Sequence, residues 1–176
     1  MSNFNETDLY PILVQELDSR LPPELECRNK QQIVYNLHYT REEDTRTQAF
    51  QTDLAVFHDG HPRVIIEVKR NSATTHDLIS YDEKAHRHKR VYPSLRYGML
   101  LVETNGLTKR YLWHSSDIDF FYCSNREMAN AGDFSEQELD ELADMIERNF
   151  KTSQKIEQTL NDKKKPMSLH RDLQFD

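Results

Sequence analysis

Two runs of alternating apolar residues, separated by the turn-forming segment HDGHP at 58–62, constrain the fold of this chain most. The runs are FQTDLAVF at 50–57 and RVIIEVKR at 63–70, and together they predict a β-hairpin. Even-numbered aliphatic residues of both runs, such as Leu54 and Ile66, can share one buried face only if paired residue numbers sum to an even value.

The predicted register decides where the polar residues of the hairpin lie. A two-residue turn at Asp59–Gly60 would give an odd sum and send Glu67 to the face opposite Asp53. We therefore expect a loop of three or five residues within HDGHP. Asp53 and Glu67 then become direct neighbours with Cβ atoms about 5 Å apart. Lys69, two residues further along the strand, stays on their face.

Two carboxylates and an ammonium group on one face suit the hydrolysis of phosphodiesters. Asp53 and Glu67 supply hard oxygen ligands for Mg²⁺, or for Mn²⁺ in its place, and the backbone carbonyl of Val68 can complete the coordination. A bound metal lowers the pKa of its water, and Lys69 can stabilise charge at phosphorus. The alternative is an ion-pair ladder on a solvated hairpin face, and the order of the surrounding elements favours the catalytic interpretation.

Hydrophobic periodicity predicts the other elements in the order helix, three strands, helix, strand. The first helix spans 6–20, where Pro11 fits only in the first turn because its missing N–H costs nothing there. A strand at 33–40 precedes the hairpin, with Ile33, Tyr35, Leu37 and Tyr39 alternating against more polar neighbours, and the segment 21–30 before it is expected to be a connector.

The second half of the chain begins with a predicted helix at 75–90. The run YGMLLVE at 97–103 is nearly all apolar, which is typical of a parallel strand buried on both faces. Segments 110–114 and 118–123 are expected to be two strands, or a strand and a loop. A capping box at 135–138 begins a last helix that runs to about residue 160.

The expected fold class is therefore α/β, with a mixed central β-sheet flanked by helices and a C-terminal helix. The length of 176 residues suits one domain over 1–160, followed by a charged tail over 161–176. No apolar run of ~18 residues and no secretory signal occurs in the sequence, so we expect a cytoplasmic protein without a membrane partner. Cys27 and Cys123 have no metal-type spacing and are expected to be free thiols.

Charge is distributed unevenly along the chain. A net charge of −7 argues against a protein that coats nucleic acid non-specifically. The window KAHRHKRVYPSLR at 84–96, however, contains five Lys or Arg and no acid, and it predicts a phosphate-contacting surface. The alternative is a solvated helix end. The basic residues expected to contact nucleic acid are Arg70, Lys84, Arg87, Lys89 and Arg90.

The hairpin, with a helix before it and a helix and strand after it, resembles the PD-(D/E)xK, or restriction-endonuclease-like, nuclease superfamily. The resemblance implies an αβββαβ core in which Asp53 and Glu67 are the metal carboxylates and Lys69 is the catalytic lysine. Thr52 stands where the name-giving pattern has Pro. More narrowly, ETDLYPIL, the Asp-aliphatic strand, EVKR and a later Asn-Gly turn, over about 6–112, resemble the nuclease domain at the N-terminus of type I restriction subunits.

This resemblance also implies roles for residues outside the hairpin. Tyr81 matches the Tyr of a Gln-x-x-x-Tyr pattern, here a nucleic-acid-binding residue, whereas Asp77 stands in the place of Gln. An acidic residue of the first helix joins the metal site in the superfamily. Glu6 is favoured for this role by the resemblance and Glu16 by its predicted burial.

The activity implied by the resemblance is Mg²⁺-dependent endonucleolytic cleavage of DNA in a restriction or other defence system. Duplex cutting by so small a subunit favours a homodimer with two sites. No helicase motor follows within 176 residues, so we expect no nucleotide cofactor in this chain. The alternatives are a repair, recombination or RNA-processing nuclease, and an inactive nucleic-acid-binding scaffold on the same fold.

Overall fold

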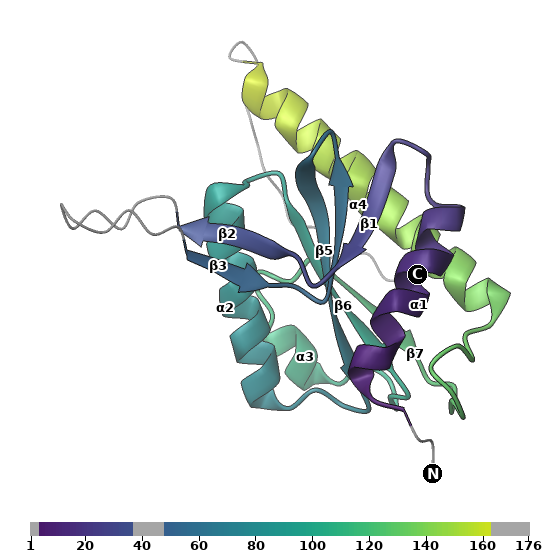
Figure 1. Ribbon diagram of the computed structural model, residues 1–176. Coiled ribbons are helices and arrows are strands. Elements are labelled where there is room, and N and C mark those ends of the chain that lie inside the picture. The colour runs from purple at the N-terminus through teal and green to yellow at the C-terminus, as the bar shows by residue number, and fades with distance from the viewer. Residues whose placement is uncertain (1–3, 37–47, 163–176) are drawn as a thin grey trace.

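The computed structural model describes residues 4–36 and 48–162, with a five-stranded mixed sheet at the centre (Figure 1). The strand order is β1-β4-β5-β6-β7. β4 pairs antiparallel with β1 and with β5, whereas β6 pairs parallel with β5 and with β7. This confirms the predicted fold class. The sheet strands are β1 (Leu25–Asn29), β4 (Leu54–His58), β5 (His61–Arg70), β6 (Arg96–Val102) and β7 (Phe120–Ser124).

Helices cover both faces of this sheet, as Figure 1 shows. Even-numbered hairpin residues, with Leu54 and Ile66 among them, pack against α1 (Glu6–Arg20) and α4 (Glu136–Asn161). Odd-numbered residues such as Ile65 pack against α2 (Thr75–Val91) and the short α3 (Lys109–Trp113). None of the described helices is long and apolar enough to cross a membrane.

The predicted hairpin register is confirmed. Leu54 pairs with Ile66 and Val56 pairs with Val64, which gives the even sum expected from burial of these side chains on one face. All four side chains are fully buried. The hydrophobic pattern therefore determines which residues of the two strands face each other.

The predicted loop length is wrong. Asp59 and Gly60 form a two-residue turn with φ angles of 51° and 74°, the positive values that a type I′ hairpin turn requires. An irregularity after Val56 restores the even sum, because Phe57 then pairs with Pro62 and one residue of β5 is left over. A β-bulge thus reconciles the favoured turn with the favoured hydrophobic register.

The strands before the hairpin also differ from the prediction. The expected connector at 21–30 contains β1, the edge strand of the sheet, in which Leu25 and Cys27 are buried. The strand expected at 33–40 is β2 (Gln32–Asn36), which pairs only with β3 (Gln48–Gln51) in a separate two-stranded ribbon. Leu37 and Tyr39 lie outside the described residues.

The remaining predicted elements are mostly confirmed, with two local differences. Pro11 lies in the second turn of α1 rather than the first. Because proline has no N–H, the carbonyl of Thr7 receives no helical hydrogen bond from it. Both residues are exposed, so water can bond to that carbonyl instead. Residues 110–114, for which a strand or a loop is the expectation, fall mostly in α3, which buries Tyr111 and exposes Trp113. The helices at 75–90 and from 136 onward and the strand at 97–103 are confirmed, and both cysteines are free thiols.

Candidate active site

Asp53 lies at a break between β3 and β4, not inside one continuous strand as the sequence pattern indicated. Two backbone hydrogen bonds tie this break to the preceding chain, from Lys30 N to Asp53 O at 3.1 Å and from Thr52 N to Gln31 O at 2.9 Å. Because these bonds fix the backbone on both sides of the break, the Asp53 carboxylate projects from a fixed point at the start of β4.

Beyond Ile66, β5 extends past the beginning of β4, and carboxylates take the place of the missing strand. The N–H of Val68 donates to Asp53 Oδ2 at 2.9 Å. The N–H of Arg70 donates to Glu6 Oε2 at 2.9 Å. Acidic side chains from two distant segments therefore meet along this open edge of β5, where backbone donors would otherwise lack partners.

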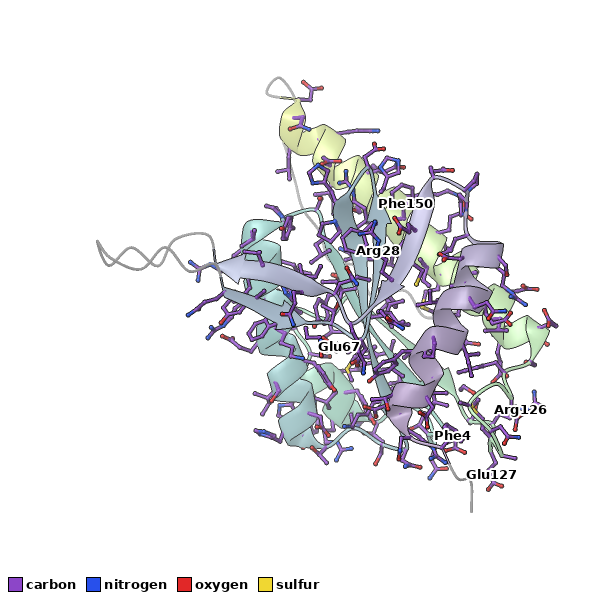
Figure 2. All side chains as sticks on the ribbon, in the orientation of Figure 1. Phe4, Arg28, Glu67, Arg126, Glu127 and Phe150 are labelled. Carbon is purple, nitrogen blue, oxygen red and sulfur yellow. The ribbon has the colours of Figure 1, made fainter. Side chains whose placement is uncertain are left out.

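Glu67 is buried on the α2 side of the sheet, with 1% of its surface exposed, and Figure 2 shows its position between α1 and α2. The hydroxyl of Tyr97 donates to Glu67 Oε1 at 2.5 Å, and the ammonium of Lys84 lies 3.5 Å from the same oxygen. Burial and the nearby charge of Asp53 raise the pKa of Glu67 to about 7. A solvated ion-pair ladder, the alternative for this hairpin face, does not fit a glutamate in this environment.

The pair formed by Asp53 and Glu67 suits a hard divalent cation. Glu67 is buried and Asp53 beside it is partly exposed, so the two carboxylates repel each other, and a cation between them would relieve this repulsion and the lost hydration of Glu67. The ligands would be these two carboxylates and the carbonyl of Val68. Among residues 4–36 and 48–162, no group of three or more His, Cys, Asp or Glu is arranged to hold a metal.

Of the two first-helix candidates, only Glu6 lies near this pair. Its charge raises the pKa of Tyr10 and Tyr81 after the larger effects of burial and of the other carboxylates. Glu16 lies about 15 Å further along the helix axis, from the usual rise per residue. Its carboxylate forms an ion pair with Arg20 at 2.5 Å.

Lys69 points toward the first turn of α2. Its ammonium lies 3.7 Å from Asp77 Oδ1, and both side chains are about one quarter exposed. Asp77 is also the capping-box residue of α2, since its carboxylate accepts the N–H of Thr74 at 2.8 Å. The residue that stands in the place of Gln in the resembled pattern therefore contacts the expected catalytic lysine.

The predicted nucleic-acid contacts separate into two groups. Tyr81 and Lys84 lie at the site, with the ammonium of Lys84 5.1 Å from the centre of the Tyr81 ring, and Arg87 and Arg90 are exposed further along α2. Arg70 is engaged by Glu103, by the carbonyl of Phe4 and by the Phe4 ring. Lys89 forms a 2.7 Å ion pair with Asp119.

Two tyrosines at the site were not predicted from the sequence. Tyr10 forms a side-chain hydrogen bond with Asp53, and burial followed by the charge of Asp53 raises its pKa. Its spacing of four residues from Glu6 on α1 is a signal that could have indicated it. Tyr97 lies on β6, and its approach to Glu67 depends on the register of a parallel pair that the sequence does not specify.

Comparison with known proteins agrees with this geometry. No curated protein matches the sequence. A known family, described as the type I restriction enzyme R protein N terminus, matches residues 23–120, which is more than half of the chain and includes Asp53, Glu67 and Lys69. On this match and on the mixed α/β fold, the chain belongs to the family of type I restriction enzyme R protein N-terminal domains, a PD-(D/E)xK nuclease-like family.

Proposed function

We propose that this protein is a Mg²⁺-dependent endonuclease that hydrolyses DNA phosphodiesters, with Asp53, Glu67 and Lys69 as its catalytic residues. The observation that supports this most directly is the adjacency of the Asp53 and Glu67 carboxylates, because Glu67 is buried and its burial and the charge of Asp53 raise its pKa to about 7. Such a pair is unfavourable without a cation, which makes a purely structural role a poor explanation. The family match supports a place in restriction or a related defence process.

The chain's own residues orient the groups that would act on the phosphate. The N–H of Val68 donates to one oxygen of Asp53, and the hydroxyl of Tyr97 donates to one oxygen of Glu67, so the remaining carboxylate oxygens would be the ones to bind a metal. When bound, Mg²⁺ would supply a water of lowered pKa and neutralise charge on the phosphate. Lys69 would stabilise the charge that develops at phosphorus, and Asp77 would hold its ammonium until substrate arrives.

The test is cleavage of supercoiled plasmid by the purified protein with Mg²⁺ or Mn²⁺. Asp53→Ala should abolish metal binding, measured by calorimetry, and cleavage with it, because one carboxylate holds Mg²⁺ poorly. Lys69→Ala should retain the metal and slow the chemical step by roughly 10²–10³, the usual loss for one charge-stabilising group.

Lys151→Ala is the matched control, since Lys151 is an exposed lysine on α4 paired only locally with Glu147. It should leave the rate unchanged. A rate for Lys69→Ala within about threefold of wild type would contradict the assignment of the catalytic lysine. Parallel assays with labelled duplex, single-stranded, nicked and RNA substrates separate a DNA endonuclease from a repair or RNA-processing nuclease.

A further inference from the structure

The β2–β3 ribbon lies apart from the central sheet and crosses α2 (Figure 1). One of its faces is attached to that helix. Ile33 is buried, and its carbonyl lies 3.1 Å from Nε2 of the buried His88. The ring of Phe50 meets the imidazole of His88 edge to face at 5.6 Å, and Tyr35 stacks on Phe50 at 3.9 Å. The inner face therefore holds the ribbon in a defined place.

The opposite face of the ribbon carries two glutamines at its base and the apolar pair Val34 and Ala49 further along. Gln32 pairs with Gln51 across the two strands, so both side chains lie on the same face. Their neighbours Ile33 and Phe50 form the next pair and point to the inner face, because side chains alternate along a strand. Gln32 and Gln51 are both exposed. The ribbon thus presents carboxamides to the surroundings.

The base of the ribbon is continuous with the candidate active site. The two backbone bonds at the β3–β4 break, Lys30 N to Asp53 O and Thr52 N to Gln31 O, join the start of the ribbon to the backbone at Asp53. Gln51 is only two residues from Asp53 in the chain. A molecule that covers the Gln32–Gln51 pair would therefore reach toward the Asp53–Glu67 pair.

The charge of this region differs from that of the whole chain. The protein has a net charge of −7 and Arg28 forms an ion pair with Glu26, yet residues 27–36 and 48–52 contain no acid and include Lys30. Lys30 is exposed at the base of the ribbon, with its ammonium 5.8 Å from the centre of the Tyr10 ring. Such a local cation favours a polyanionic ligand.

We propose that the outer face of the β2–β3 ribbon docks into the major groove of duplex DNA, with Gln32 and Gln51 at the base edges. The inference rests on the proposed function, since it concerns how substrate reaches that site. The major groove admits a two-stranded ribbon, and the carboxamide of Gln matches the donor and acceptor pair that adenine presents there. Docking in this way places a phosphodiester of the same duplex near Asp53 and Glu67.

The experiment measures binding of a labelled duplex by fluorescence anisotropy, with all variants made in a Lys69→Ala background so that cleavage does not intervene. The double variant Gln32→Glu/Gln51→Glu should weaken duplex binding at least tenfold, because two carboxylates replace two groove contacts next to phosphate. Gln32→Ala/Gln51→Ala should weaken binding to an A·T-rich duplex several-fold more than to a G·C-rich duplex. Gln137→Glu, an exposed glutamine on α4, is the matched control and should bind like the background protein.

Three outcomes would overturn the ribbon inference. They are unchanged duplex affinity of the double Glu variant, an equal loss for Gln137→Glu, and a loss for single strands as large as that for duplex. Thermal unfolding of each variant checks that these substitutions leave the fold intact. Binding is measured without cleavage, so a wild-type protein that cuts no plasmid would refute the proposed function separately, whereas normal cutting with unaffected variants would refute only the ribbon inference.

Discussion

Burial and negative charge conflict at Glu67, whose side chain is 1% exposed. Its pKa is raised from 4.5 to about 7, first by burial and then by the charge of Asp53, while Lys84 and Tyr97 act in the opposite direction. A glutamate with a higher pKa in the folded chain binds its proton more tightly there than in the unfolded chain. Its contribution to stability is therefore complete below pH 4.5 and is lost as the pH rises through about 7.

This conflict predicts a pH-dependent stability of the metal-free protein. Relative to Glu67→Gln, a neutral variant of the same shape, the wild type should lose up to about 3 kcal/mol between pH 4.5 and 8. Urea unfolding at several pH values measures the difference. Mg²⁺ at pH 8 should restore stability to the wild type and not to the variant. Parallel curves for the two proteins at every pH would show that Glu67 does not titrate as described.

The pairing of β6 with β7 requires a residue without a side chain at position 98. Gly98 of β6 pairs with Phe120 of β7, and a Cβ at position 98 would lie 2.2 Å from the Phe120 ring. The ring therefore covers the glycine. Tyr97, the residue before Gly98, donates a hydrogen bond to Glu67, so a shift of β6 would also move a residue of the candidate active site.

Gly98→Ala should therefore destabilise the protein by about 1–3 kcal/mol, because the Phe120 ring must leave its place or β6 must shift. Denaturant unfolding measures the change. Gly132→Ala is the control, since the nearest side-chain atom to its added Cβ is Ile12 Cδ1 at 3.9 Å. Combining Gly98→Ala with Phe120→Ala should recover part of the loss, and strict additivity of the two substitutions would argue against the clash.

In the complete fold, the basic residues of α2 lie in two different environments. Lys89 has a side chain that is 13% exposed and pairs with Asp119, which is 3% exposed and also pairs with Arg96. Arg87 and Arg90, in contrast, are exposed. The sequence places these residues side by side, yet the fold buries the ion pair of Lys89 and leaves Arg87, paired with the exposed Glu83, and Arg90 at the surface.

Removing these charges should have two different effects. Arg87→Ala and Arg90→Ala should weaken DNA binding and flatten its dependence on salt, by nearly one unit of slope for each phosphate that the protein no longer neutralises. Lys89→Ala should instead lower the free energy of unfolding by about 1–3 kcal/mol, since it removes a charged hydrogen-bonding partner from a buried carboxylate. Titrations at several salt concentrations, with thermal unfolding of each variant, distinguish the two. An unchanged salt slope for both arginine variants would show that Arg87 and Arg90 do not contact phosphates.

Short-range periodicity in the sequence was enough to predict the hairpin register, two of the helices and one buried strand. Alternation in two neighbouring runs was enough to predict that Leu54 faces Ile66, because a slip of one residue would expose every aliphatic side chain on that face. The same register brings Asp53 beside Glu67. Helical spacing and a capping box predicted α2 and α4, and the all-apolar run predicted the buried parallel strand β6.

Which distant segments contact each other could be seen only in the folded protein. The sheet strand beside β4 is β1. Its segment contains prolines at 22 and 23, and only two of its residues are buried, so the sequence does not indicate a strand there. β2 has the more regular alternation, yet it pairs with β3 in the ribbon. Likewise, Glu6 rather than Glu16 reaches β5, because the direction in which α1 crosses the sheet sets which end of the helix meets that edge. Periodicity reports that a face is buried, whereas the partner that buries it is chosen by packing over the whole chain.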